Sequence, residues 1–205
     1  MLRRTALLLV LGVVAVTTAG CSGDGGSSSQ PAGKPTATPA VTPGAAPADT
    51  KSVTVGPISI AVPTTMTLLS GLSAQPGQTV VGYRTAAPGA DGRSGALVVT
   101  TSVDATRTAQ AEAEALAKAK VDLHQAKDVQ VAPVTWPGLD SAYTVTYEDA
   151  SGTAAGQQPL HTLVLIGTTA DKKGVNVTAK APPDVFTSQS FAQIVGSVRA
   201  AGTSS

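Results

Sequence analysis

One apolar stretch decides the fold class that the sequence predicts: Leu160-His161-Thr162-Leu163-Val164-Leu165-Ile166-Gly167-Thr168. Consecutive side chains of a β-strand point to opposite faces of the sheet, and in this stretch the positions of both parities are mostly apolar. A strand of this composition is buried on both faces. The sequence therefore predicts a central strand over residues 160–168, with a packed layer on either side of it.

The segments around this strand alternate between apolar and polar residues, which is typical of half-buried strands. Their connections are short, and short connections between consecutive strands favour antiparallel pairing. The predicted strands cover residues 58–62 (stopping at Pro63), 80–84, 97–103, 129–135, 142–148 and 175–181, with turns at 88–92 and 171–174 and a mobile hairpin loop at 152–158.

Two segments have helical periodicity. The first covers residues 108–126 and is expected to bury Leu116, Ala119 and Leu123, with Glu114 and Lys118 paired on its solvent side. The second covers residues 188–199 after the strand-stopping Pro182 and Pro183. It is expected to start at Thr187 as cap with a staple of Phe186 and Phe191, and to bury Phe191, Ile194, Val195 and Val198.

These elements predict an α+β fold over residues 52–201: a central antiparallel β-sheet with helices packed on its faces, in three layers. The remaining residues, 202–205, are a short tail. Only 3% of the residues are aromatic, so the core must be built mainly from Val, Leu, Ile and Ala.

The first 20 residues resemble a signal peptide. Arg3 and Arg4 supply the positive charge, and the apolar run over residues 6–16 is too short for a bilayer, which needs roughly 20 apolar residues. Thr18-Ala19-Gly20-Cys21 then resembles the bacterial lipobox, and Cys21 is the only cysteine of the chain. The resemblance implies a lipid on Cys21 and an anchor on the extracytoplasmic face of the cell membrane. The alternative is a plain secretory signal followed by a chance cysteine.

Residues 21–51 form a linker rich in Pro, Thr, Ser and Gly. Five prolines recur at intervals of four (Pro31, Pro35, Pro39, Pro43 and Pro47). A segment with so little apolar bulk does not offset its chain entropy and is expected to be disordered. Its prolines favour an extended spacer between membrane and domain. The alternative is a low-complexity tail without a function of its own.

Charge excludes one class of partner. The chain has 14 Lys plus Arg and 13 Asp plus Glu, interspersed without a basic face, whereas proteins that bind nucleic acid carry one. We therefore expect no nucleic-acid partner. We expect the protein to reach a membrane through the lipid anchor.

The sequence contains no strong signal for a catalytic, metal-binding or recognition site. The sequence has no Gly-x-Ser-x-Gly elbow, so His124, expected at the surface, and His161, expected partly buried or at an edge, have no evident nucleophile. Glu148 and Asp149 point to opposite faces of a strand and are interpreted as solvated charge, so no metal or other cofactor is expected. Trp136 is either an exposed recognition aromatic or, as the favoured interpretation, a residue closing the core edge.

Several features together resemble one protein family. They are the lipobox cysteine, the Pro/Thr linker, the strand ending Ile60-Ala61-Val62-Pro63 and the terminal Phe191-x-x-Ile194-Val195 helix. This combination resembles the actinobacterial LpqN-type lipoproteins, which are similar in fold to the PsbP family of extrinsic photosystem proteins. The resemblance implies an α/β/α sandwich and a non-catalytic envelope protein that binds partners.

Three hypotheses for function remain. The first is an anchored binding or accessory module for an envelope protein or a cell-wall polymer. The second is a carrier of apolar ligands such as lipids, which would require a large apolar cavity. The third is a hydrolase, which would require His124 or His161 to meet a carboxylate and a hydroxyl.

Overall fold

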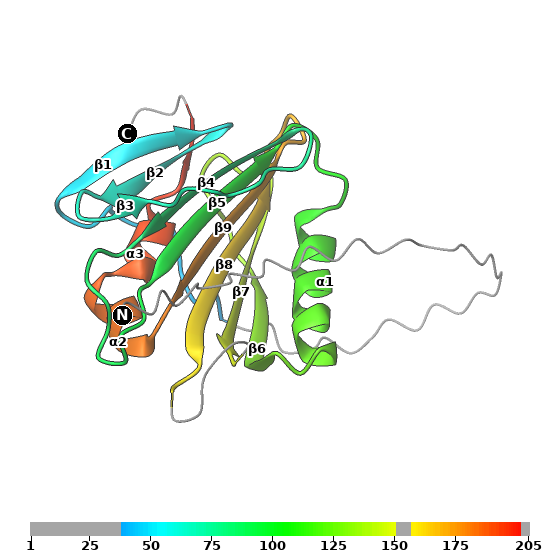
Figure 1. The fold of residues 1–205 in the computed structure, drawn as a ribbon. Helices are drawn as coiled ribbons and strands as arrows, with labels where there is room; N and C mark the ends of the chain where they lie inside the picture. Colours follow the sequence, from blue (N-terminus) through cyan, green and yellow to red (C-terminus); the bar gives the residue numbers. More distant parts are fainter. Residues whose placement is uncertain (1–37, 151–156, 202–205) are drawn as a thin grey trace. The chain divides into compact units, whose positions relative to one another are not determined.

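Seven antiparallel strands form the main sheet, in the order β3-β4-β5-β9-β8-β7-β6 (Figure 1). The computed structural model describes residues 38–150 and 157–201, which belong to one compact unit. The strands are β3 Thr67–Leu68, β4 Gln78–Arg84, β5 Ala96–Ser102, β6 Ala126–Pro133, β7 Ser141–Asp149, β8 Leu160–Thr168 and β9 Gly174–Ala181.

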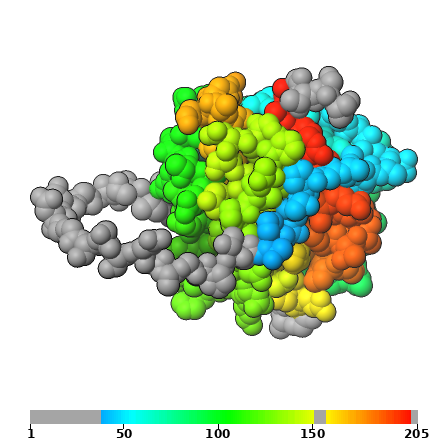
Figure 2. Space-filling view, turned by 180° about the vertical axis from the view of Figure 1, so that it is seen from behind, coloured from blue at the N-terminus to red at the C-terminus, as the bar shows by residue number. Residues whose placement is uncertain are grey.

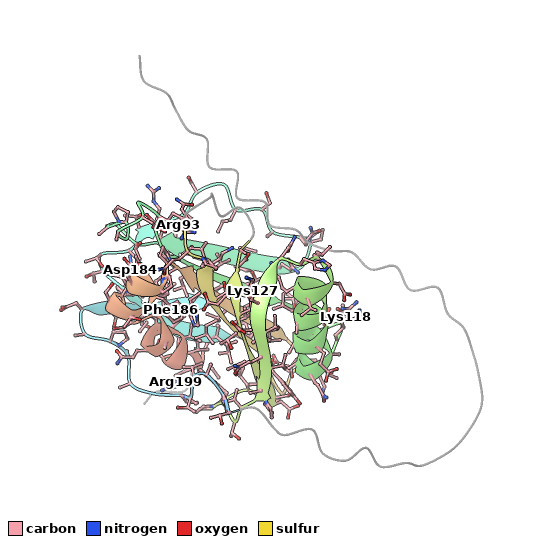
Figure 3. The ribbon with its side chains drawn as sticks, turned by 90° about the horizontal axis from the view of Figure 1, so that it is seen from below. Arg93, Lys118, Lys127, Asp184, Phe186 and Arg199 are labelled. Atoms are coloured by element: carbon pink, nitrogen blue, oxygen red, sulfur yellow. The ribbon has the colours of Figure 1, made fainter. Side chains whose placement is uncertain are left out.

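Helices cover both faces of this sheet (Figures 1 and 3). The helix α1, Ala109–Asp122, packs on β6, β7 and β8. The other face carries two short helices, α2 Pro183–Ser188 and α3 Phe191–Gly196, and a second sheet of three strands in the order β1-β2-β10. The strands of this small sheet are β1 Thr50–Val55, β2 Ile58–Pro63 and β10 Arg199–Ala200. The predicted α+β fold with a central antiparallel sheet is confirmed.

The strand β8 separates two apolar cores. Leu163 and Leu165 belong to the larger core, under α2, α3 and the small sheet, whereas Val164 and Ile166 belong to the smaller core under α1. All four side chains are buried. The prediction that residues 160–168 form a strand covered on both faces is therefore confirmed, with both boundaries as expected.

The helix α1 ends earlier than predicted, and of its expected buried face Leu116 packs in the core whereas Leu123 does not. It ends at Asp122, because His124 adopts a left-handed conformation (φ 51°) and β6 begins at Ala126. The expected stripe through Leu123 is wrong, since that side chain is 54% exposed. The face that packs on the sheet consists of Ala109, Ala113, Leu116 and Ala117. Small alanines bring the helix backbone close to the sheet.

The ion pair expected within α1 also differs. Lys118 contacts Asp122 at 2.5 Å, while Glu114 accepts a hydrogen bond from the amide of Gln110. Both pairs are spaced i, i+4 on the exposed side of the helix. Figure 3 shows Lys118 on the side of α1 that faces away from the sheet.

The expected single helix over residues 188–199 is two short helices. Pro183 starts α2 at its first turn, where its missing N–H costs nothing, and Ser190 breaks the chain with a φ of 54° before α3. Thr187 therefore lies inside α2 and donates to the Pro183 carbonyl instead of capping a helix. The predicted buried stripe is confirmed, because all of its members are fully buried: Phe191, Ile194, Val195 and Val198.

The domain includes residues before its predicted boundary at Ser52. Strand β1 starts at Thr50 and pairs with β2 through a two-residue turn, in which Gly56 takes the positive φ that such hairpins require. Val41, inside the segment expected to be a disordered linker, is 9% exposed and belongs to the larger core. The linker prediction thus extends too far toward the domain. Its part over residues 21–37 lies outside the described residues, as do residues 152–156 of the expected loop and the tail over residues 202–205.

Candidate functional site

A buried ionic cluster lies where α1 meets the end of β7. Asp149 is 1% exposed, and its Oδ2 accepts a hydrogen bond from Lys180 Nζ at 2.7 Å. The Lys120 ammonium of α1 lies 3.6 Å from the same oxygen. The interpretation of Asp149 as solvated charge is therefore wrong, because the alternation of β7 points this carboxylate under α1 rather than to solvent.

The neighbour Tyr147 shares this cluster. Its ring lies in the smaller core, with Lys120 Nζ 5.4 Å from the ring centroid. Burial, and then the negative charge of Asp149, raise the pKa of Tyr147 to about 12. Tyr143, on the same face of β7, packs against this core as well.

The cluster ties together three elements: α1 through Lys120, β7 through Asp149 and β9 through Lys180. Its lysine side chains remain 21% and 30% exposed, whereas the carboxylate is enclosed. One buried carboxylate between two cations is an arrangement that holds layers in place. No sequence pattern indicates this cluster, because its members are distant in the chain and meet only through the strand order.

Glu148 points to the opposite face of the sheet, as expected for the residue adjacent to Asp149. Its Oε1 lies 2.7 Å from His161 Nδ1, and the imidazole packs edge to face on Phe186 of α2 with ring centroids 4.4 Å apart. Both polar side chains are about a third exposed. His161 is thus partly buried, in agreement with the prediction, and it pairs with a carboxylate.

The hydrolase hypothesis requires a hydroxyl beside such a pair. Among the residues that the structure describes, no Ser or Thr hydroxyl makes a hydrogen bond to His161. His124 is exposed directly after α1, as expected. The described residues therefore bring together a base and an acid without a nucleophile.

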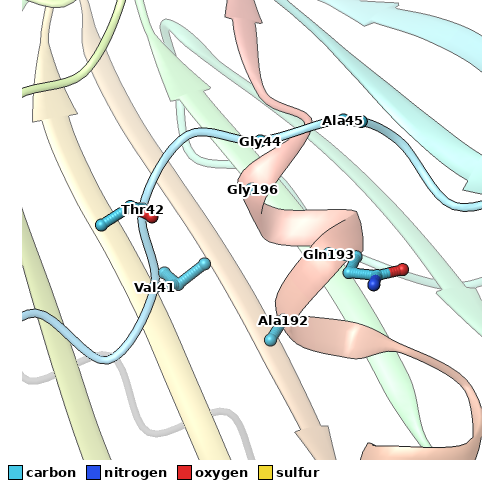
Figure 4. A pocket seen from close by; sticks show the side chains of 7 residues that line it. All are labelled: Val41, Thr42, Gly44, Ala45, Ala192, Gln193 and Gly196. Carbon is cyan, nitrogen blue, oxygen red and sulfur yellow. The ribbon is translucent and has the colours of Figure 1, made fainter.

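A surface hollow of about 340 Å³ lies between α3 and the chain that leads into β1 (Figure 4). It is open to solvent and is lined by Val41, Thr42, Gly44, Ala45, Ala192, Gln193 and Gly196. The N–H of Gly44 donates to the Gly196 carbonyl at 2.9 Å, and Arg199 Nη2 donates to the Gly44 carbonyl at 2.7 Å. The segment that forms one wall of the hollow is therefore held to α3 and to Arg199 by hydrogen bonds.

Trp136 occupies the core edge. It is 2% exposed, belongs to the larger core, and its indole N–H donates to the Val198 carbonyl at 2.9 Å. This is the interpretation that the sequence favoured. A recognition role would require an exposed ring, so Trp136 does not serve as a surface binding residue in this structure.

The other predicted site residues lie outside the described part of the chain: Cys21 and its lipobox residues Thr18, Ala19 and Gly20. Within residues 38–150 and 157–201, no group of three His, Cys, Asp or Glu side chains could hold a metal ion. None of the helices in these ranges is long and apolar enough to cross a membrane.

Comparisons with known proteins find little. No protein-family model matches the chain, and no curated protein matches it. Among solved structures, the chain is similar to the Ran-binding protein Mog1p of Saccharomyces cerevisiae, with 14% sequence identity and a TM-score of 0.44 over 72% of this chain and 87% of that one. At these values the likeness assigns neither a family nor a function.

Proposed function

We propose that this chain is an extracytoplasmic lipoprotein, anchored to the cell membrane through a lipid on Cys21. Its α+β domain is a non-catalytic binding or accessory module of the cell envelope, in keeping with the resemblance to LpqN-type lipoproteins. The observation that carries the proposal is the sequence Thr18-Ala19-Gly20-Cys21, placed directly after a short charged and apolar leader. A lone cysteine at that point has a chemical reason to be there, because the thiol is the acceptor of the lipid.

The described domain supports recognition at the surface. The cores above and below β8 consist mainly of aliphatic side chains with a few aromatic ones. The hollows beside α3 and beside the ends of β6 and β7, of about 340 and 360 Å³, are open depressions. A carrier of apolar ligands needs an enclosed apolar cavity, and neither hollow is one. The partner is an envelope protein or a cell-wall polymer that meets the outside of the domain.

Fractionation of cells of the natural host tests the anchor. The wild-type protein is expected in the membrane fraction and in the detergent phase after detergent partitioning. Cys21→Ala is expected to lose this partitioning, whereas the linker variant Ser27→Ala, which leaves the lipobox intact, behaves as wild type. Recovery of wild type from the aqueous phase, in the same proportion as Cys21→Ala, overturns the proposal.

A further inference from the structure

Residues 41–45 cross the end of α3 as an extended segment, which we call the strap (Figures 2 and 4). The side chain of Val41 enters the larger core. Gly44 is held through both of its backbone groups, with its N–H on the Gly196 carbonyl and its C=O on the Arg199 guanidinium. A segment that was expected to be free linker is thus attached to residues of the domain that lie more than 150 positions later in the chain.

Arg199 acts as the clamp of this attachment. Its Nη1 donates to the carbonyls of Gly196 (2.8 Å) and Val198 (2.7 Å), while Nη2 reaches Gly44. The last carbonyls of a helix lack partners within the helix, and a guanidinium supplies charge-assisted donors for them. One side chain therefore joins the end of α3 to the strap.

Gly196 makes the close approach feasible. A Cβ at this position would lie 3.0 Å from the Thr42 carbonyl oxygen and 3.6 Å from the Val41 side chain. Any larger residue would push the strap away from α3. The receiving surface is therefore shaped for a backbone that lies directly on the helix.

We propose that the strap is releasable, and that Gly196 of α3 and Arg199 of β10 form the site that holds it. Val41 is the only buried residue of the strap; Thr42, Gly44 and Ala45 are exposed. Segments held by few buried contacts open at a much lower free energy than the core does. The strap can thus leave α3 at the cost of one side chain, Val41, from the larger core, while the other residues of both cores stay packed.

Release changes the reach of the domain; this consequence rests on the proposed anchor at Cys21. With the strap closed, the tether ends at Val41, about 20 residues after the acylated cysteine. With the strap open, the tether extends to Asp49 and gains eight residues (49 − 41). At no more than about 3.3–3.6 Å per extended residue, the domain can reach at most about 30 Å farther from the membrane. Arg199 therefore sets the distance at which the module meets its partner.

Hydrogen exchange of the mature chain, observed amide by amide by NMR, tests the strap. In wild type, the Gly44 amide is expected to be protected, yet to exchange at least about 100-fold faster than the Leu165 amide of β8. Arg199→Ala is expected to speed exchange at Gly44 at least about tenfold further without changing Leu165. The control Arg107→Ala removes an exposed arginine that contacts Glu112 and not the strap, and is expected to leave both rates unchanged.

Gly196→Ala supplies a second variant in case loss of Arg199 disturbs folding. Alanine suits the helix but crowds Thr42, so exchange at Gly44 is expected to rise while Leu165 stays protected. Three results would each overturn the proposal of a releasable strap. They are an unprotected Gly44 amide in wild type, equal exchange rates at Gly44 and Leu165, and equal effects of Arg199→Ala and Arg107→Ala on exchange at Gly44. These readouts do not depend on acylation, so failure of the anchor would be seen separately, in the detergent partitioning of Cys21→Ala.

Discussion

Replacing Asp149 by Asn leaves Lys120 and Lys180 without the carboxylate that they share under α1. Breaking a buried ion pair on one side costs about 3–5 kcal/mol, and partial exposure of both lysines places the expected loss near ~3 kcal/mol. Urea unfolding measures it. The control is Asp122→Asn, which removes an exposed partner of Lys118 and is expected to cost less than ~1 kcal/mol. Equal losses in the two variants would show that the cluster does not stabilise the domain.

Tyr147 gives the same cluster a pH signature. Its pKa is raised to about 12 in the folded domain, mainly by burial, against about 10 for an unfolded tyrosine. The folded state therefore disfavours ionisation: the stabilisation is complete below about pH 10 and is lost as the pH rises through 12. Tyr147→Phe is expected to lose less stability over this interval, by up to about 2–3 kcal/mol.

Chemical unfolding of Tyr147→Phe and wild type at a series of alkaline pH values measures this difference. Titration of the tyrosinate absorbance supplies the matching optical signal, as the difference between the two proteins. Parallel stability curves for the two proteins up to pH 12 would contradict the assignment of the alkaline loss to Tyr147.

At the scale of elements, the contact between α1 and the sheet depends on alanine. Ala109 and Ala113 are fully buried, so Ala113→Leu forces extra volume between α1 and β7 and is expected to cost about 1–3 kcal/mol. Ala111→Leu places the same side chain on the exposed side of the helix, with an expected change within about 0.5 kcal/mol. Thermal unfolding compares the two. A neutral Ala113→Leu would mean that α1 is not closely packed on the sheet.

Elements whose pattern is purely local were predictable from the sequence. Apolar residues at both odd and even positions indicate strand β8, and helical spacing indicates the buried stripe that begins in α3. Strand β1 was missed because only one of its residues, Val55, is fully buried, so its sequence lacks a clear alternation. The break between α2 and α3 was missed because Pro183 was interpreted as the end of a strand and not also as the start of a helix.

Contacts between distant elements were not predictable. Lys120, Asp149 and Lys180 come together only because β8 lies between β7 and β9, and the strap is held by Arg199 from the other end of the chain. Strand order and the path of the linker over α3 decide both, and neither leaves a periodic pattern in the sequence. By contrast, the location of Trp136 at the core edge was predictable, because a large ring with a single polar atom is favoured at such positions.

At the scale of the whole molecule, the proposed function joins a lipid-anchored tether to a domain that would act through its surface. The strap places the end of the tether on α3, and the ionic cluster fixes α1 on the opposite face of the sheet. In the proposed function, such a module is tethered on the side of α3 and can meet a partner with its other surfaces. This proposal depends on the acylation of Cys21.

The most direct test is the intact mass of the protein purified from its own host, compared with that of Cys21→Ala. We expect a mature chain that begins at Cys21 and carries the added mass of a diacylglyceryl group and any N-acyl chain, with this added mass absent from the variant. An unmodified Cys21 in a protein released to the medium would contradict the central claim.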